Sequence, residues 1–128
     1  MTQTPDNNGG ITLTPLEIAK AAAKALDSKL GREIKIIKIS DLTVLADYFV
    51  FASGNSATQV KALANEVDFT LGKLGVKALR TEGYDSGGWV LIDFNTVVVH
   101  VFRPETREFY SLERLWADGE EIDAGLEA

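Results

Sequence analysis

Two stretches of the chain repeat apolar residues every three or four positions, which is the spacing of an amphipathic helix. The first stretch predicts a helix over about residues 15–30. Its start is marked by Thr14, Pro15 and Glu17, which suit a capping box with proline at the first helical position. The second stretch predicts another helix over about residues 57–74.

Short runs of β-branched and aromatic residues lie outside these helices and predict strands. Residues 47–52 are mostly apolar on both faces, which is typical of a central strand. Residues 89–94 and 97–102 are separated only by Asn95 and Thr96, a spacing that predicts an antiparallel hairpin. We also expect strands at residues 34–39 and 76–84, and a last helix after Pro104 in which Phe109, Leu112 and Trp116 share one face.

The order helix, strand, strand, helix, strand, strand, strand, helix predicts an α/β (α+β) domain. We expect a mixed five-stranded sheet, with the second helix as a crossover and the helices packed mainly on one face. The 128 residues are enough for one domain and too few for two. We therefore predict a flexible leader at residues 1–13, the folded domain at 14–116 and an acidic flexible tail at 117–128.

The charge distribution separates the ends of the chain from its body. The formal net charge is −6, and Asp6 with the five acidic residues after Ala117 accounts for all of that imbalance. Residues 7–116 are therefore neutral and lack the basic excess that drives binding to a nucleic-acid backbone. We expect little direct nucleic-acid binding and favour a protein partner.

Composition also limits the chemistry and the compartment. The chain contains no cysteine, which excludes disulfides and thiolate metal sites. No apolar run approaches the ~20 residues of a membrane-spanning helix, and the first ten residues lack a signal-peptide pattern. We expect no membrane association and a cytoplasmic location.

Gly54-Asn55-Ser56 is the first candidate for chemistry, because it precedes the second predicted helix, where backbone amides can hold a phosphate. A metal-dependent nucleotidyltransferase would also need clustered carboxylates, whereas Asp47 and Asp93 occur singly. His100 is the only histidine, and its valine neighbours favour a structural or interface position over catalysis. We expect no cofactor and no metal.

Strand alternation around Trp89 predicts a second kind of site. Trp89, Leu91 and Asp93 share one face of their strand, whereas Val90 and Ile92 lie on the other. Because both sets contain apolar residues, helices can cover one face while the other keeps an apolar patch. Tryptophan is a common anchor of protein interfaces, so both the core and an interface remain open for this residue.

Several longer motifs occur in a fixed order along the chain. They are Asp41-Leu42-Thr43, Asp47-Tyr48-Phe49-Val50, Ser53-Gly54-Asn55-Ser56, Glu82-Gly83-Tyr84, Trp89-Val90-Leu91-Ile92-Asp93, Val99-His100-Val101-Phe102 and the segment from Arg107 to Trp116. Together these motifs resemble the two signatures of the ribosomal silencing factor family, also called the iojap family. The resemblance spans about residues 14–116, so it covers nearly the whole predicted domain and neither end of the chain.

The resemblance implies a nucleotidyltransferase-like fold without catalytic carboxylates, and a protein that is not an enzyme. It implies binding to the large ribosomal subunit through ribosomal protein L-fourteen, which sterically blocks joining of the small subunit and represses translation. Some relatives form dimers, so a homodimer stays open, as does a role as a large-subunit assembly factor. The alternative from the residues alone is a nucleotidyltransferase-fold enzyme using Gly54-Asn55-Ser56 and Asp93.

The resemblance also ranks the candidate partner-binding residues. Trp89 corresponds to the family tryptophan of the fourth strand and is the first candidate. Leu91 and Asp93 follow because they share its predicted face, and Tyr84 and His100 come after them. The family more often has Gly-Asp where this chain has Asn95-Thr96, which leaves the type of hairpin turn open.

Overall fold

In the computed structural model, which describes residues 12–126, the first helix begins as the sequence predicts. Helix α1 (Pro15–Ser28) opens with a complete capping box. The Glu17 amide donates to Thr14 Oγ1 at 3.1 Å, and the Thr14 amide donates to Glu17 Oε1 at 2.8 Å. Both hydrogen bonds satisfy amides that the helix itself leaves unpaired. Helix α2 (Ala57–Lys73) is also close to its predicted range.

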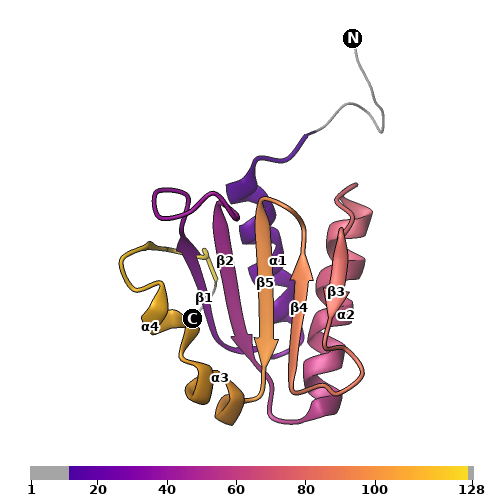
Figure 1. Ribbon diagram of the computed structural model, residues 1–128. Coiled ribbons are helices and arrows are strands. Elements are labelled where there is room, and N and C mark those ends of the chain that lie inside the picture. Colours follow the sequence, from indigo (N-terminus) through magenta and orange to yellow (C-terminus); the bar gives the residue numbers. More distant parts are fainter. Residues whose placement is uncertain (1–11, 127–128) are drawn as a thin grey trace.

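The sheet is mixed, as predicted, and has the strand order β3-β4-β5-β2-β1-β6 (Figure 1). Strand β2 lies in the middle and pairs in parallel with β5, while β4 and β5 form the predicted antiparallel hairpin. The parallel pairing requires a crossover, and α2 lies within that connection. The strands are β1 (Arg32–Lys38), β2 (Tyr48–Ser53), β3 (Arg80–Glu82), β4 (Trp89–Asp93), β5 (Val97–Phe102) and β6 (Glu120–Ile122).

Helices α1 and α2 pack together on one face of the sheet, which Figure 1 shows as the far side. Their apolar stripes bury the main core, to which β4 contributes Val90 and Ile92. A smaller core of aromatic and aliphatic side chains lies on the opposite face, and Leu112 and Trp116 pack against it. Leu112 begins α4 (Leu112–Leu115), which follows α3 (Pro104–Tyr110). Within residues 12–126, no helix is long and apolar enough to cross a membrane.

The sixth strand corrects the prediction of five strands, and it lies within the segment predicted to be an acidic tail. Residues 117–128 were expected to lie outside the folded domain, but β6 pairs antiparallel with β1, and Ile122 pairs with Ile36. Ile122 also packs against the main core. The sequence does not indicate this contact, because the residues on either side of Ile122 are acidic. The predicted leader falls mostly on residues 1–11, which are outside the described part of the chain.

The last helical segment also differs from its prediction. Ser111 adopts a left-handed conformation with φ 49°, which ends α3 and separates it from α4. The break separates Phe109, which is 80% exposed, from Leu112 and Trp116, which pack on the smaller core. The prediction that these three side chains share one face of a single helix was therefore wrong for Phe109.

The hairpin turn between β4 and β5 uses Asn95 in the left-handed region, with φ 78°. Asparagine tolerates this conformation better than most residues other than glycine. The Asn95 amide donates to Asp93 Oδ1 at 2.8 Å, which fixes the turn from its own first strand. Asn95 therefore takes the positive φ that a glycine at this turn would adopt.

Candidate protein interface

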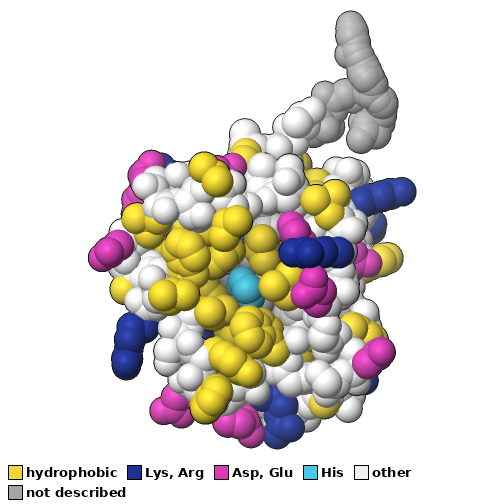
Figure 2. Space-filling model, in the orientation of Figure 1, with side chains coloured by type: hydrophobic (Ala, Val, Ile, Leu, Met, Phe, Trp, Pro, Cys, Tyr) yellow, Lys and Arg dark blue, Asp and Glu magenta, His cyan; other side chains and the backbone are white. Residues whose placement is uncertain are grey.

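One face of the sheet carries apolar side chains that helices cover only in part. We call this surface the open face, and define it by the residues of β4 and β5 that point away from α1 and α2. Figure 2 shows hydrophobic side chains gathered on it around the single histidine. The sequence prediction of alternation in β4 is confirmed, because Val90 and Ile92 are buried while the intervening residues are only half-buried. The open face consists of Trp89, Leu91, Asp93, Val98, His100 and the fully buried Phe102.

Trp89 lies between the smaller core and the surface. Its ring packs against Phe102 and Tyr110, with ring centroids 5.6 Å and 4.9 Å away. Its indole nitrogen donates a hydrogen bond to Nδ1 of His100 at 3.2 Å. The ring is thus anchored by the fold and only half-buried, so part of it is accessible to a partner.

His100 lies in the centre of the open face and is almost completely buried. Its ring contacts Phe49 edge-on at 4.9 Å between centroids and stacks against Phe51 at 5.3 Å. Burial among apolar rings disfavours the charged form and lowers the pKa of His100 to about 4. The imidazole is therefore neutral at neutral pH, and its Nδ1 is free to accept the Trp89 hydrogen bond.

The buried histidine predicts a specific dependence of stability on pH. His100 in the unfolded chain has a pKa of about 6.5, so the unfolded state binds more protons than the folded state between about pH 4 and 6.5. The free energy of unfolding should fall as pH is lowered through this range, by up to about 1.4 kcal/mol per unit. Urea unfolding from about pH 4.5 to 7 measures this slope.

His100→Leu provides the comparison for that measurement, because it removes the titrating group and keeps an apolar filling. Its unfolding free energy should lose the slope between about pH 4 and 6.5. Glu113 has a pKa lowered mainly by its hydrogen bond to Arg107, so its contribution is lost only at lower pH, and in both proteins. Equal slopes for the two proteins would contradict the assigned burial of a neutral imidazole.

A small group of charges borders the open face at the β3 edge. Arg80 lies 3.4 Å from Asp93 and 3.3 Å from Glu82, measured between its guanidinium nitrogens and the carboxylate oxygens. Asp93 is the more shielded carboxylate, with 20% of its side chain exposed. These pairs give the apolar surface a polar rim, which is typical of protein interfaces.

The structure does not bring Tyr84 onto the open face. Its hydroxyl accepts a hydrogen bond from Asn65 Nδ2 at 2.9 Å, and Lys61 Nζ lies 5.5 Å from its ring centroid. Both partners belong to α2, which covers the other face of the sheet. Tyr84 therefore lies apart from the other four candidates, because the loop before β4 turns it toward the helix.

The candidate phosphate site at Gly54-Asn55-Ser56 is occupied by the chain's own side chains. The Asn55 amide donates to Gln59 Oε1 at 2.6 Å, and the Gln59 amide donates to Ser56 Oγ at 3.1 Å. A phosphate would have to displace these caps. Among the described residues, no three or more His, Asp or Glu side chains lie close enough together to hold a metal ion.

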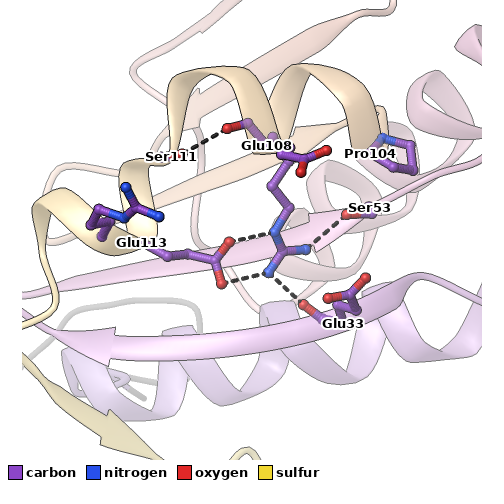
Figure 3. A pocket seen from close by; sticks show the side chains of 8 residues that line it. Glu33, Ser53, Pro104, Glu108, Ser111 and Glu113 are labelled. Atoms are coloured by element: carbon purple, nitrogen blue, oxygen red, sulfur yellow. Dashed lines mark hydrogen bonds and ion pairs between the residues drawn. The ribbon is translucent and has the colours of Figure 1, made fainter.

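Sequence reasoning missed the role of Arg107, which is buried and donates a hydrogen bond to Ser53, the last residue of β2. Figure 3 shows Ser53, Glu33 and Glu113 converging on one guanidinium, with dashed lines for the hydrogen bonds. Its guanidinium donates two hydrogen bonds to the Glu113 carboxylate, at 2.7 and 3.1 Å. It also donates to Ser53 Oγ and to the Glu33 carbonyl oxygen, both at 2.8 Å. The residues of this network line a pocket of about 420 Å³. Arg107 thus ties the turn between α3 and α4 to the sheet, and so fixes Tyr110 beside Trp89.

Gly83 shapes the backbone on which Trp89 sits. It has φ +80°, and a Cβ atom there would overlap the carbonyl oxygen of Trp89. We expect Gly83→Ala to lower the free energy of unfolding by about 1–3 kcal/mol, because of strain and this clash. Chemical denaturation measures the loss.

Gly72→Ala is the matched control for that substitution. Gly72 lies in α2, and a Cβ atom there has nothing within 4 Å. Its replacement should leave stability unchanged or raise it by up to about 1 kcal/mol. Equal effects of the two alanines would show that Gly83 is not constrained by its contact with Trp89.

Comparison with known proteins assigns the family. The family model described as "Ribosomal silencing factor during starvation" matches residues 12–128. The chain belongs to the ribosomal silencing factor family. The match includes β6 and the acidic residues beside it, so the resemblance expected to stop near residue 116 extends to the end of the chain.

Relatives named as ribosomal silencing factors span most of this chain. The Bacillus subtilis protein is 39% identical over 111 residues, covering 85% of this chain and 94% of its own length. The Chromobacterium violaceum protein is 45% identical over 100 residues, which is 78% of this chain and 82% of its own length. A mouse protein named "Mitochondrial assembly of ribosomal large subunit protein 1" is 34% identical over 67% of this chain and 39% of its own length.

The fold is shared with solved structures of this size. A crystal structure of a Chromobacterium violaceum protein superposes with a TM-score of 0.81 and 40% identity, covering 91% of this chain and 96% of that one. A Bacillus halodurans structure gives a TM-score of 0.74 at 34% identity, covering 84% and 97%. The predicted α+β fold class is confirmed by these matches.

Proposed function

We propose that this chain docks on the large ribosomal subunit through ribosomal protein L-fourteen and sterically blocks joining of the small subunit. Translation is repressed because a subunit whose joining face is covered cannot form a complete ribosome. The protein acts in the cytoplasm, as a binding protein and not as an enzyme. Its membership of the silencing factor family supports this proposal.

The observation that carries the proposal is the open face itself. It presents a half-buried indole and Leu91 within an apolar surface, and Arg80, Glu82 and Asp93 form its polar rim. An apolar centre with an anchored aromatic ring and a charged border suits a protein partner better than a small substrate. At the candidate phosphate site, by contrast, the backbone amides of Asn55 and Gln59 already donate to side-chain oxygens of the chain itself.

A subunit-joining assay tests this function directly. Purified large subunits are incubated with the chain, small subunits are added, and complete ribosomes are separated by sucrose-gradient sedimentation. We expect the chain to sediment with large subunits and the complete-ribosome peak to fall. Sedimentation of the chain alone is measured first, because a homodimer formed through the open face would compete with L-fourteen. Unchanged joining at saturating protein would contradict the proposal.

A role in large-subunit assembly is the second candidate, and the name of the mouse relative favours it. Both roles use the same contact with the large subunit, so the open face alone does not separate them. A strain lacking the gene separates them, because only the assembly role requires immature large subunits to accumulate during rapid growth.

A further inference from the structure

The hydrogen bond between Trp89 and His100 joins neighbouring strands across the open face. The two side chains are diagonal neighbours, since Leu91 is directly opposite His100 and Trp89 is opposite Phe102. The donor is the indole Nε1–H and the acceptor is the imidazole Nδ1, 3.2 Å away. The indole N–H is the only hydrogen-bond donor of the Trp89 side chain, so its bond to His100 orients the polar edge of the ring.

His100 is the fixed member of this pair. Only 4% of its surface is exposed, and the rings of Phe49, Phe51 and Phe102 lie within 6.2 Å of its own, measured between centroids. Trp89, by contrast, is half-buried and lies at the edge of the same cluster. A rotation of the indole is therefore opposed mainly by its hydrogen bond and by its contacts with Phe102 and Tyr110.

The other ring nitrogen of His100 shows that a histidine at this position lowers the stability of the fold. When Nδ1 accepts a hydrogen bond in the neutral ring, the proton is on Nε2. Nε2 is buried and has no hydrogen-bond partner in the described part of the chain. An unpaired buried donor typically costs about 1–3 kcal/mol, which an apolar side chain of similar size would avoid. Fold stability alone therefore does not account for a histidine here.

We propose that His100 is a positioning residue, which holds the Trp89 indole in the orientation that partner binding requires. This inference rests on the proposed function, because it assumes that Trp89 contacts L-fourteen. Without the acceptor, the indole can turn its N–H toward water and present a different edge to the partner. The ring would then have to be reordered on binding, at a cost in affinity.

A double-mutant cycle tests whether His100 acts through Trp89. His100→Leu removes the acceptor, and Trp89→Phe keeps an aromatic ring while removing the donor. Binding to purified L-fourteen is measured by calorimetry for the single and double variants. We expect His100→Leu to weaken binding about tenfold when Trp89 is present, and less than about twofold together with Trp89→Phe.

Two further measurements separate positioning from a general structural effect. His100→Asn places an amide oxygen near the position of Nδ1 and should recover most of the lost affinity. The indole N–H resonance of Trp89 should shift in His100→Leu, while that of Trp116, the second indole in the same spectrum, should shift much less. Circular dichroism confirms that each variant is folded.

Equal losses from His100→Leu in both backgrounds, or an unmoved Trp89 resonance, would overturn the positioning role. In that case the proposed function stands, because the wild-type chain still binds. If the wild-type chain binds neither L-fourteen nor the large subunit, the proposed function fails and this inference fails with it. A recovered affinity in His100→Asn without any shift of the Trp89 resonance in His100→Leu also counts against it.

Discussion

Replacing Trp89 with alanine should weaken binding to the large subunit by about thirtyfold to a thousandfold. The indole is the largest side chain of the open face, and its ring is held in place by Phe102 and Tyr110. Truncating a central, anchored tryptophan of an interface typically costs about 2–4 kcal/mol, and each 1.4 kcal/mol is about tenfold in affinity. Cosedimentation at a series of protein concentrations measures the change.

Phe69→Ala is the control for that substitution. Phe69 is also an exposed aromatic residue, with 59% of its surface accessible, but it lies on α2 behind the sheet. Its truncation should leave subunit binding within about twofold of the wild type, because surface changes outside an interface contribute little. If the Phe69 variant loses as much affinity as the Trp89 variant, or a folded Trp89→Ala protein binds normally, the interface lies elsewhere.

Replacing Arg107 with alanine should lower the free energy of unfolding by about 3–5 kcal/mol, as breaking a buried ion pair usually does. The substitution leaves Ser53 Oγ and the Glu33 carbonyl without their donor, and the Glu113 carboxylate with only Lys35, 3.3 Å away. Urea unfolding monitored by tryptophan fluorescence measures the loss. Subunit binding should weaken as well, since Tyr110 beside Trp89 is fixed by the same segment.

Arg114→Ala provides the matched control for the buried arginine. Arg114 is an exposed residue of α4 and borders the same pocket. Its removal should change the free energy of unfolding by less than about 0.5 kcal/mol, as surface substitutions usually do. A loss below 1 kcal/mol for Arg107→Ala would mean that water replaces the guanidinium, and would contradict its assigned role as an anchor.

Those parts of the fold that follow from local pattern were predictable from the sequence. The capping box at Thr14 and Glu17 needs only residues three positions apart, and the structure contains both of its hydrogen bonds. The separation of Trp89 from Val90 onto opposite faces follows from the two-residue period of a strand. The central position of β2 follows from its apolar residues on both faces, because only a covered strand can bury both.

The parts that depend on distant contacts were not predictable in this way. β6 exists because Glu120–Ile122 meets β1, more than 80 residues earlier in the chain. Tyr84 packs against α2, where its hydroxyl accepts a hydrogen bond from Asn65, and no spacing in the sequence indicates this contact. Ser111 interrupts the last helix although no glycine or proline marks the break. Arg107 also looks like an ordinary surface arginine until its four acceptor contacts are seen.

Both edges of the sheet are short and charged. β3 consists of Arg80–Glu82 and β6 of Glu120–Ile122, so each outer strand has three residues, two of them charged. Short, charged outer strands discourage another chain from adding a strand by backbone pairing. The protein can therefore present an apolar surface on the open face while its sheet edges resist the strand-by-strand growth that produces fibrils.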